Sequence, residues 1–455
     1  PMHLAPRFLK ALLPVLAFLA ALWWTEHWAV VFLGLSALAV AVIIHEKNWQ
    51  IPAFRAVGAI LPWSVKVDLD AVSMMLPGEW GIGVLATAVV LFTVREKSWP
   101  KGWKNWLPIV WILTFILPVV LSSMLKVSVK FALINAIYVV VFYYGTLNFG
   151  REEAHRWIRN YFISFVGVAL WGLVQFYQYD FNPITIVGIF KPFYYSSTYV
   201  GAVAAIFAGY FIGLAPKARK NLFSALVAVA IVVLSESRAA LLSLVVMLFA
   251  LGLLRLPKPA RILAPVLIIA LGFLAVGPEK IREAFTYNRV ESHDPNANVF
   301  EETLSVTNVQ TDVSNMERLN RWVSALKMFQ ERPHIGFGPG TYQFQYIPFQ
   351  EAGLKNRLSV RNPDDVPQGS GGSAHSEVLL QLSENGWPTA LVFVLMLGLW
   401  MGRGLWAPAK MHWVPYVLGL TTYVFHMNVN NFLNQPGFAF LFWTFGAMIM
   451  IKSHE

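Results

Sequence analysis

The sequence contains no cysteine and few charged residues. Only 13% of its 455 residues are Asp, Glu, Lys or Arg, about half the roughly 25% that is usual in a soluble domain. The lack of thiols excludes disulfides, thiol catalysis, iron–sulfur clusters and cysteine-ligated zinc. Because 56% of the residues are hydrophobic, soluble domains could not bury so much apolar mass. The composition therefore predicts a polytopic membrane protein.

Apolar runs long enough to cross about 30 Å of hydrocarbon follow one another along most of the chain. We expect an all-α protein with about 12–14 transmembrane helices. A weaker stretch at 52–66 could be a short span, a re-entrant segment or an interfacial helix, and an even span count would place both termini in the cytoplasm. The runs lie at about 9–24, 28–44, 79–94, 106–122, 131–148, 157–178, 195–214, 221–236, 238–254, 262–277, 377–402, 411–429 and 435–451.

The net charge of +10 has a topological explanation. Fifteen of the 35 Lys and Arg residues gather in five loops. These loops alternate with loops that carry only isolated charges, which is the pattern of cytoplasmic loops in membrane proteins. We therefore expect partners among membrane lipids and no binding of nucleic acid. The basic clusters lie at Arg95–Lys104, Arg151–Arg159, Lys217–Lys220, Arg255–Arg261 and Arg403–Lys410.

One long polar segment interrupts the spans on the outer side. Residues 278–376 are rich in Asn, Asp, Pro and Gly, and a loop of this length is usually functional or disordered. The sequence thus divides into N-terminal transmembrane helices at 1–277, a large outer loop at 278–376 with an amphipathic helix, and C-terminal transmembrane helices at 377–455.

The outer loop contains a predicted helix with two arginines. Ser314 and Glu317 match a capping box, and apolar residues recur at helical spacing from Met316 to Phe329. Arg318 and Arg321 lie three positions apart, so they project from neighbouring surface near the positive helix end. Pro333 ends the helix, and three glycines then predict an exposed turn. A simpler alternative is a helix that lies on the membrane with solvated arginines.

A second candidate is Arg238, which follows Ser235-Glu236-Ser237 between two apolar runs. Free backbone N–H groups at the start of a helix favour an anion, and Arg238 adds a permanent positive charge. The side chain could equally extend to the lipid headgroups.

The third candidate is His375, which follows Ser370-Gly371-Gly372-Ser373. We expect a flexible hinge to deliver it into the first turn of a helix, where the dipole disfavours imidazolium and keeps the ring neutral near pH 7. Gly386 should end this short helix, and Pro388 should begin the next. An ordinary interfacial histidine is the alternative.

Metal chemistry has weaker support. Asp68-Leu69-Asp70 is a D-x-D pattern in the first outer loop, but Val67–Asp70 also reads as the alternation of a strand. No HExxH, Walker loop or dinucleotide fingerprint is present. We expect no metal and no cofactor.

Three patches together resemble the O-antigen ligase and O-antigen polymerase superfamily, the bacterial lipid-linked glycan transferases. His375-Ser376 precedes Gly386-Trp387-Pro388-Thr389 by a nine-residue gap, as in the family pattern. Arg318 precedes Trp322 in an R-x-x-x-W helix that leads to a glycine turn, and Ser237-Arg238-Ala239-Ala240 resembles the family's start of a span. These motifs cover about a quarter of the chain, and their order agrees with the family.

The resemblance implies a GT-C-like glycosyltransferase of the bacterial inner membrane whose active site faces the periplasm. A ligase would transfer a glycan from undecaprenyl diphosphate to lipid A–core oligosaccharide in lipopolysaccharide biosynthesis, with inversion and without a metal. Arg238 and Arg318, with Arg321 as a duplicate, would bind the diphosphate, and His375 would deprotonate the acceptor. Arginines can supply the charge that a diphosphate leaving group needs.

The sequence leaves two alternative functions open. An O-antigen or exopolysaccharide polymerase shares the same motifs and topology. A lipid-linked glycan transporter would need charged residues deep within the spans, and the charges here cluster at their ends.

Overall fold

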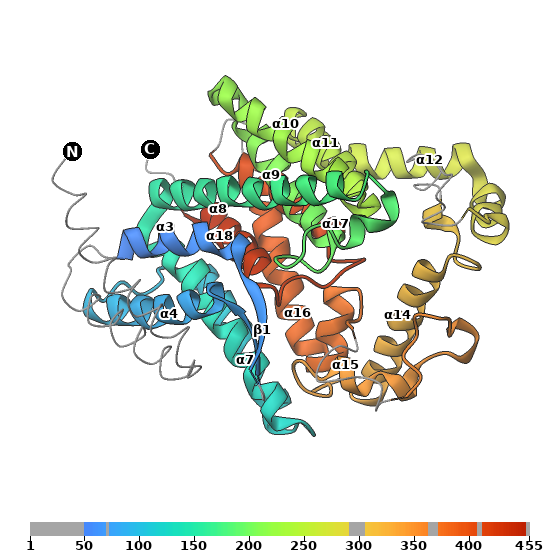
Figure 1. The fold of residues 1–455 in the computed structure, drawn as a ribbon, viewed down its shortest axis with the longest axis horizontal. Coiled ribbons are helices and arrows are strands. Elements are labelled where there is room, and N and C mark those ends of the chain that lie inside the picture. Colours follow the sequence, from blue (N-terminus) through green and yellow to red (C-terminus); the bar gives the residue numbers. More distant parts are fainter. Residues whose placement is uncertain (1–49, 70–71, 291–304, 363–371, 407–411, 452–455) are drawn as a thin grey trace.

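The computed structural model describes residues 50–69, 72–290, 305–362, 372–406 and 412–451. Within these ranges the chain is helical apart from turns and one two-stranded antiparallel sheet (Figure 1). The prediction of an all-α polytopic membrane protein is confirmed. The predicted spans at 9–24 and 28–44 lie outside the described residues.

The predicted apolar runs in the described ranges all form helices. Six helical stretches there are long and apolar enough to cross a membrane, or seven if the bent α12 is one span. The stretch Leu125–Gln178 counts once, although it contains two predicted spans and a left-handed Gly150 between them. The helices are α4 (Gly78–Arg95), α5 (Leu107–Leu113), α6 (Ile116–Val120), α7 (Leu125–Tyr138), α8 (Gly145–Gln178), α9 (Ser197–Leu214), α10 (Arg219–Leu234), α11 (Arg238–Arg255), α12 (Lys258–Tyr287), α16 (Glu377–Trp406), α17 (Val414–His426) and α18 (Pro436–Met450).

The ambiguous stretch at 52–66 forms a short helix and the start of a hairpin. Helix α3 (Gln50–Ile60) has 11 residues, about 16 Å at 1.5 Å per residue, which is too short to cross the membrane alone. Strand β1 (Val65–Leu69) then pairs with β2 (Val72–Leu76), with Val65 opposite Leu76. The alternating pattern at Val67–Asp70 thus belongs to a strand up to Leu69, and Asp70 of the D-x-D lies outside the described residues.

Helices α9 and α18 form the centre of the bundle. Both are apolar on all sides and almost wholly buried, as expected of helices surrounded by others. Gly209 lets α9 approach α17 closely, because a Cβ there would lie 2.7 Å from the Leu418 carbonyl carbon. Such contacts through small residues are typical of membrane helix packing.

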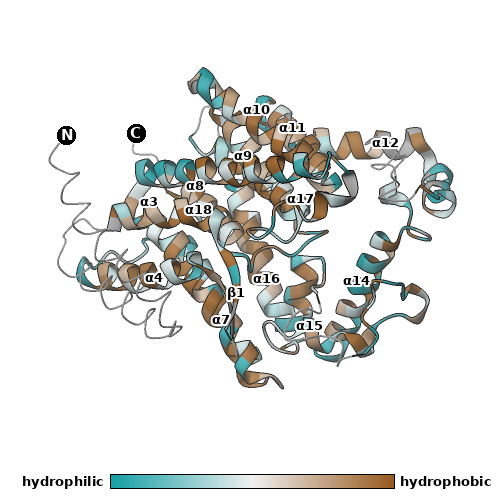
Figure 2. Ribbon diagram, in the orientation of Figure 1, coloured by the Kyte–Doolittle hydropathy of each residue, from teal (hydrophilic) through white to brown (hydrophobic). Residues whose placement is uncertain are grey.

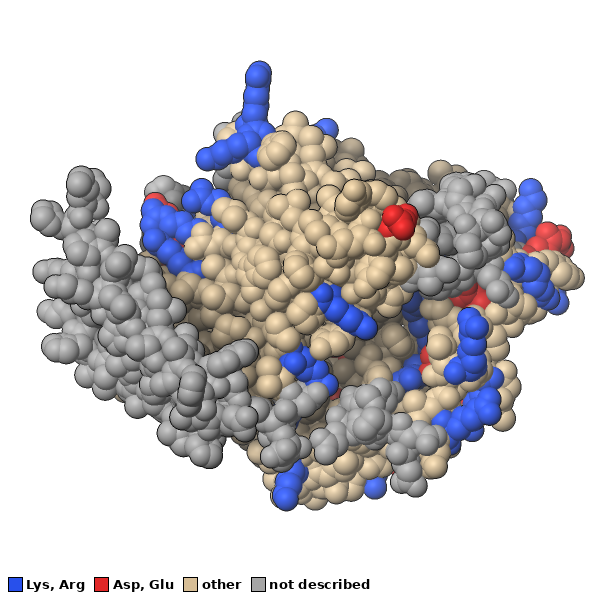
Figure 3. Space-filling model, in the orientation of Figure 1, with Lys and Arg blue, Asp and Glu red and all other residues tan. Residues whose placement is uncertain are grey.

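The polar segment forms an arm beside the bundle. Helix α12 bends at left-handed Gly277, next to the predicted boundary at 278, but continues to Tyr287. Helix α14 (Val313–Glu331) then descends to α15 (Tyr342–Gln345) beside α16 (Figure 1). The bundle helices are mostly hydrophobic, whereas the arm carries both hydrophobic and hydrophilic residues (Figure 2). Lys and Arg gather at the rim of the molecule and around the recess between bundle and arm (Figure 3).

Candidate active site

The start of α14 differs from the predicted capping box. The N-cap is Asp312, whose carboxylate accepts a hydrogen bond from Asn315 N at 2.8 Å. The capping-box prediction is therefore wrong, because Asp312 lies two residues earlier and is an equally good cap. Glu317, the presumed partner in the box, instead forms an ion pair with Arg321, with 2.7 Å between Oε1 and Nε.

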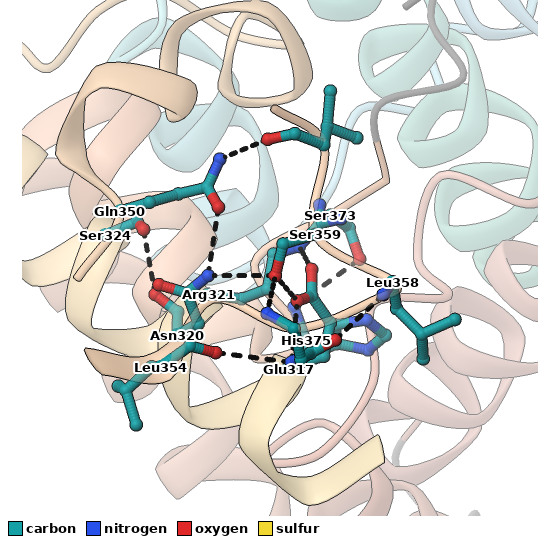
Figure 4. A network of polar contacts seen from close by, with 12 residues as sticks. Glu317, Asn320, Arg321, Ser324, Gln350, Leu354, Leu358, Ser359, Ser373 and His375 are labelled. Atoms are coloured by element: carbon teal, nitrogen blue, oxygen red, sulfur yellow. Dashed lines mark hydrogen bonds and ion pairs between the residues drawn. The ribbon is translucent and has the colours of Figure 1, made fainter. Parts of the chain in front are cut away.

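The polar face of α14, rather than its apolar stripe, packs against the protein. The apolar stripe from Met316 to Phe329 is only partly buried, and Leu326 is 43% exposed. The buried polar side chains form a hydrogen-bonded network with the segment 350–360 (Figure 4). In it Glu317 accepts from Ser359 Oγ at 2.6 Å, and Asn320 donates to Gln350 at 3.0 Å. The alternative of a helix with solvated arginines is thus wrong.

Arg321 is engaged on several sides. Its side chain is 7% exposed and paired with Glu317, and its guanidinium lies 4.3 Å from the centre of the Tyr346 ring. Its backbone carbonyl accepts from the Tyr342 hydroxyl at 2.8 Å. These contacts fix α14 to the region around α15.

Arg318 is less completely bonded. Its Nη1 donates to Asn315 Oδ1 at 3.2 Å, while the buried Nε has no hydrogen-bond partner in the described part of the chain. Burial lowers the pKa of Arg318, and the nearby charge of Arg238 lowers it further, with Asp312 opposing both. Two cations that lie close together in a partly desolvated site favour the binding of an anion.

Arg238 is the first residue of α11, as the sequence predicted. Ser237 is the N-cap, and its Oγ accepts from Ala240 N at 3.3 Å. Glu236 has a left-handed backbone with φ of 48°, which turns the chain between α10 and α11. The Arg238 guanidinium donates to Ser305 Oγ, so this side chain points toward the arm and away from its own helix.

His375 precedes its helix and does not lie in the first turn. Helix α16 begins at Glu377, and His375 has a left-handed φ of 52°. Its carbonyl accepts from Trp322 Nε1 of α14 at 3.2 Å, which gives the tryptophan of the R-x-x-x-W pattern a structural role. The next peptide N–H, of Ser376, donates to Asn431 Oδ1 at 3.1 Å. Such a backbone in a non-glycine residue is uncommon and clusters at functional sites.

The His375 ring is neutral at physiological pH, but for a different reason from the one expected. Its pKa is lowered to about 3, first by burial and then by the charges of Arg318 and Arg321. The Asn430 side chain and the Val429 backbone approach the ring and partly oppose this shift. Nδ1 is buried and makes no hydrogen bond of good geometry within the described residues. The ring is therefore held as a free base beside two cations.

The predicted glycine turn is buried and joins the arm to α16. The N–H groups of Phe337 and Gly338 donate to the carbonyls of Ser383 and Glu384 at 3.1 and 2.7 Å. A Cβ at Gly336 would lie 2.3 Å from the Glu384 carbonyl carbon, and one at Gly386 would lie 2.4 Å from that of His334. The break at Gly386 was predicted correctly. The expectation of an exposed turn was wrong, because the backbone at Gly336 and the backbone at Gly386 pack closely against each other's segments.

The structure places all four predicted residues in one neighbourhood. Arg238 and Arg318 influence each other electrostatically, and both Arg318 and Arg321 act on His375. The sequence did not indicate the turn at 427–433. There Met427 O accepts from Glu377 N at 2.7 Å, and Glu377 Oε1 accepts from the N–H groups of Phe432 and Leu433 at 2.8 Å each. The polar run Asn428-Val-Asn-Asn431 between two apolar runs was the available signal.

A helical bundle with two arginines and a neutral histidine at one place defines a multi-pass membrane protein with a candidate site for an anionic substrate. A family model described as O-antigen ligase matches residues 223–394. The match supports the resemblance to the O-antigen ligase family over this segment, and that family suggests a glycosyltransferase-like enzyme that acts on lipid-linked substrates. The matched segment contains Arg238, Arg318, Arg321 and His375. No curated protein matches the chain.

Proposed function

We propose that the protein transfers a glycan from undecaprenyl diphosphate to lipid A–core oligosaccharide. In this proposal the reaction occurs at the periplasmic face of the bacterial inner membrane, with inversion and without a metal. The observation that supports it best is the neutral, partly buried His375 beside a pair of arginines. A base and an anion site must adjoin for transfer from a diphosphate to a hydroxyl.

The arginines serve the leaving group. As the bond between the anomeric carbon and the diphosphate oxygen breaks, its electron pair and negative charge move onto the diphosphate. Fixed guanidinium groups stabilise that charge without reorganising, and a guanidinium matches phosphate geometry in two hydrogen bonds. We assign the diphosphate to Arg238 and Arg318. The buried Nε of Arg318 has no hydrogen-bond partner within the described residues.

His375 serves the acceptor. A neutral imidazole nitrogen takes the proton of the acceptor hydroxyl, whose oxygen forms the new bond to the anomeric carbon from the face opposite the diphosphate. The products are an inverted glycoside, undecaprenyl diphosphate and imidazolium, which then returns its proton to water. Although a pKa of about 3 describes a weak base, a bound diphosphate places negative charge beside the ring and raises that pKa.

Arg321 has a supporting role in this proposal. Its guanidinium is paired with Glu317 and lies over Tyr346, so it contributes positive potential and holds α14 in place. Of the two arginines that the sequence could not separate, Arg318 is our choice for the substrate.

Purified protein in lipid vesicles tests the proposal directly. With undecaprenyl-diphosphate-linked glycan and lipid A–core, we expect glycan on the core at the same rate with and without EDTA, because arginines replace a metal. Electrophoresis of the labelled core measures transfer. A requirement for Mg²⁺ or Mn²⁺ would contradict the arginine mechanism.

The same assay separates the alternatives. Elongation of the lipid-linked glycan without core acceptor would identify a polymerase. Movement of the intact lipid-linked glycan between the vesicle leaflets, with no transfer, would identify a transporter.

The pH dependence gives a further prediction. Because the pKa of His375 is lowered, the neutral ring persists well below the ordinary histidine pKa of about 6.5. We expect kcat/KM for the donor to stay level between about pH 5 and 7. Since the bound diphosphate raises the pKa, kcat should begin to fall at a higher pH than kcat/KM. A fall of kcat/KM centred near pH 6.5 would contradict the environment described for His375.

A further inference from the structure

A cavity of about 230 Å³ adjoins the His375 region and has no part in the mechanism above. Its walls come from the β1–β2 hairpin, from residues 193–199 and from residues 431–437. Asn431 belongs both to this cavity and to the candidate active site, because its Oδ1 accepts from the peptide N–H that follows His375. Asn431 therefore connects the cavity to the peptide that follows His375, although His375 itself does not line the cavity.

The walls combine aromatic faces with amides. Tyr194 and Tyr199 are stacked with 5.2 Å between ring centres, and Phe432 meets Tyr199 edge-on at 5.2 Å. Tyr195 and Gln435 add an exposed ring and an exposed amide. Aromatic faces attract the positively polarised C–H groups of a sugar ring, and amides both donate to and accept from hydroxyls. The buried Nδ2 of Asn431 makes no hydrogen bond of good geometry within the described residues, and a sugar hydroxyl can accept from it whereas a purely apolar chain cannot.

The charge pattern also distinguishes this cavity from the arginine pair. Lys66 is the sole arginine or lysine among its lining residues, whereas Arg238 and Arg318 lie together by His375. The volume is below the roughly 300–1,000 Å³ of pockets for drug-sized ligands. It suits one sugar ring and leaves the rest of an oligosaccharide outside.

We propose that this cavity binds the sugar ring of the acceptor whose hydroxyl His375 deprotonates, an inference that rests on the proposed function. One turn reaches both places: Val429 and Asn430 approach the His375 ring, and Asn431 and Gln435 line the cavity. Because His375 itself does not line the cavity, the reacting hydroxyl belongs to the part of the acceptor that extends past Asn431 toward the histidine, while the diphosphate occupies the arginines of α11 and α14. This arrangement separates the nucleophile from the leaving group, as inversion requires.

Two variants at the exposed edge of the cavity provide the test. Tyr195→Ala removes a ring that is 54% exposed, and Gln435→Ala removes an exposed side-chain amide. In the vesicle assay we expect each to raise KM for lipid A–core about five- to tenfold, the loss of one stacking contact or hydrogen bond. The donor KM and the kcat at saturating acceptor should change less than about twofold.

Tyr179→Ala is the matched control, because Tyr179 is 53% exposed and does not line the cavity. It should leave both KM values unchanged. An unchanged acceptor KM in both cavity variants would overturn the inference. A rise of the donor KM alone would also overturn it, because the cavity would then hold a donor sugar.

Direct binding distinguishes failure of this inference from failure of the proposed function. Core oligosaccharide released from lipid A by mild acid can be titrated into the protein and followed by saturation-transfer NMR. If the protein proves inactive in transfer, weaker binding by Tyr195→Ala than by Tyr179→Ala would still support a sugar site. Equal binding by the two variants would exclude it.

Discussion

His375→Asn is expected to reduce kcat by about 10²- to 10⁴-fold, the usual contribution of a general base. Asparagine tolerates the left-handed backbone that His375 adopts better than most residues do, so this variant keeps the turn and the hydrogen bond from Trp322 to the carbonyl. The loss should therefore reflect the missing imidazole. Initial rates of glycan transfer in vesicles measure it.

His334→Asn is the control for this variant. His334 is an exposed histidine whose Nδ1 accepts from Trp387 Nε1 at 2.8 Å, and the proposed reaction does not use it. We expect its rate to stay within about threefold of the original, well short of the loss of a general base. Both proteins should elute as folded monodisperse particles in detergent. Near-normal transfer by folded His375→Asn would refute the assignment of the base.

The second large effect separates the two arginines of α14. Arg318→Gln should lower kcat by about 10²- to 10³-fold, as removal of one charge-stabilising donor does, with little change in thermal stability. Since Arg318 lowers the pKa of His375, its removal raises that pKa, and the acid limb of kcat/KM should move to higher pH. A purely structural role would not move this limb.

Arg321→Gln should act mainly on stability. It leaves Glu317 without its partner at a site where both side chains are less than one-tenth exposed, and breaking a buried ion pair costs about 3–5 kcal/mol. The unfolding temperature should fall, and a double variant that also carries Glu317→Gln should regain part of the lost unfolding temperature. Lys327→Gln is the control, because Lys327 pairs with Glu351 at the surface and such pairs contribute little.

The opposite pattern would reverse the assignment. If Arg321→Gln abolished transfer without loss of stability, and Arg318→Gln kept its rate, then Arg321 would be the diphosphate ligand. Thermal unfolding in detergent and transfer rates, measured on the same preparations, give both readouts.

The helices of the bundle could be predicted from sequence because the hydrocarbon thickness demands long apolar runs. The break at Gly386 could also be predicted, because Asn385-Gly386 followed by Pro388 is a strong local signal. The orientation of α14 was not predictable. Its polar face is buried by partners such as Gln350 and Ser359, and hydropathy alone assigns the apolar stripe to the interior.

Sequence motifs indicated the residues of the candidate site, but they did not predict the local structure around those residues. Ser314 and Asp312 are both good caps, and only the fold selects between them. The left-handed backbone of His375 depends on Trp322 and Asn431, which are distant in sequence. The pKa of His375 is lowered by burial and by the charges of Arg318 and Arg321. The three-dimensional fold, and not the position of His375 in a helix, brings these groups together.

The contact between Gly336 and Gly386 bears on how this protein can be recombined with its relatives. Each glycine accommodates the backbone of the other segment, so the two halves of this contact form a matched pair across the arm and α16. A chimera that exchanges only residues 278–376 would bring in a foreign partner for Gly386 and would disturb the neighbourhood of His375. Domain exchange aimed at altering acceptor choice should therefore extend through residue 389 and carry both halves together.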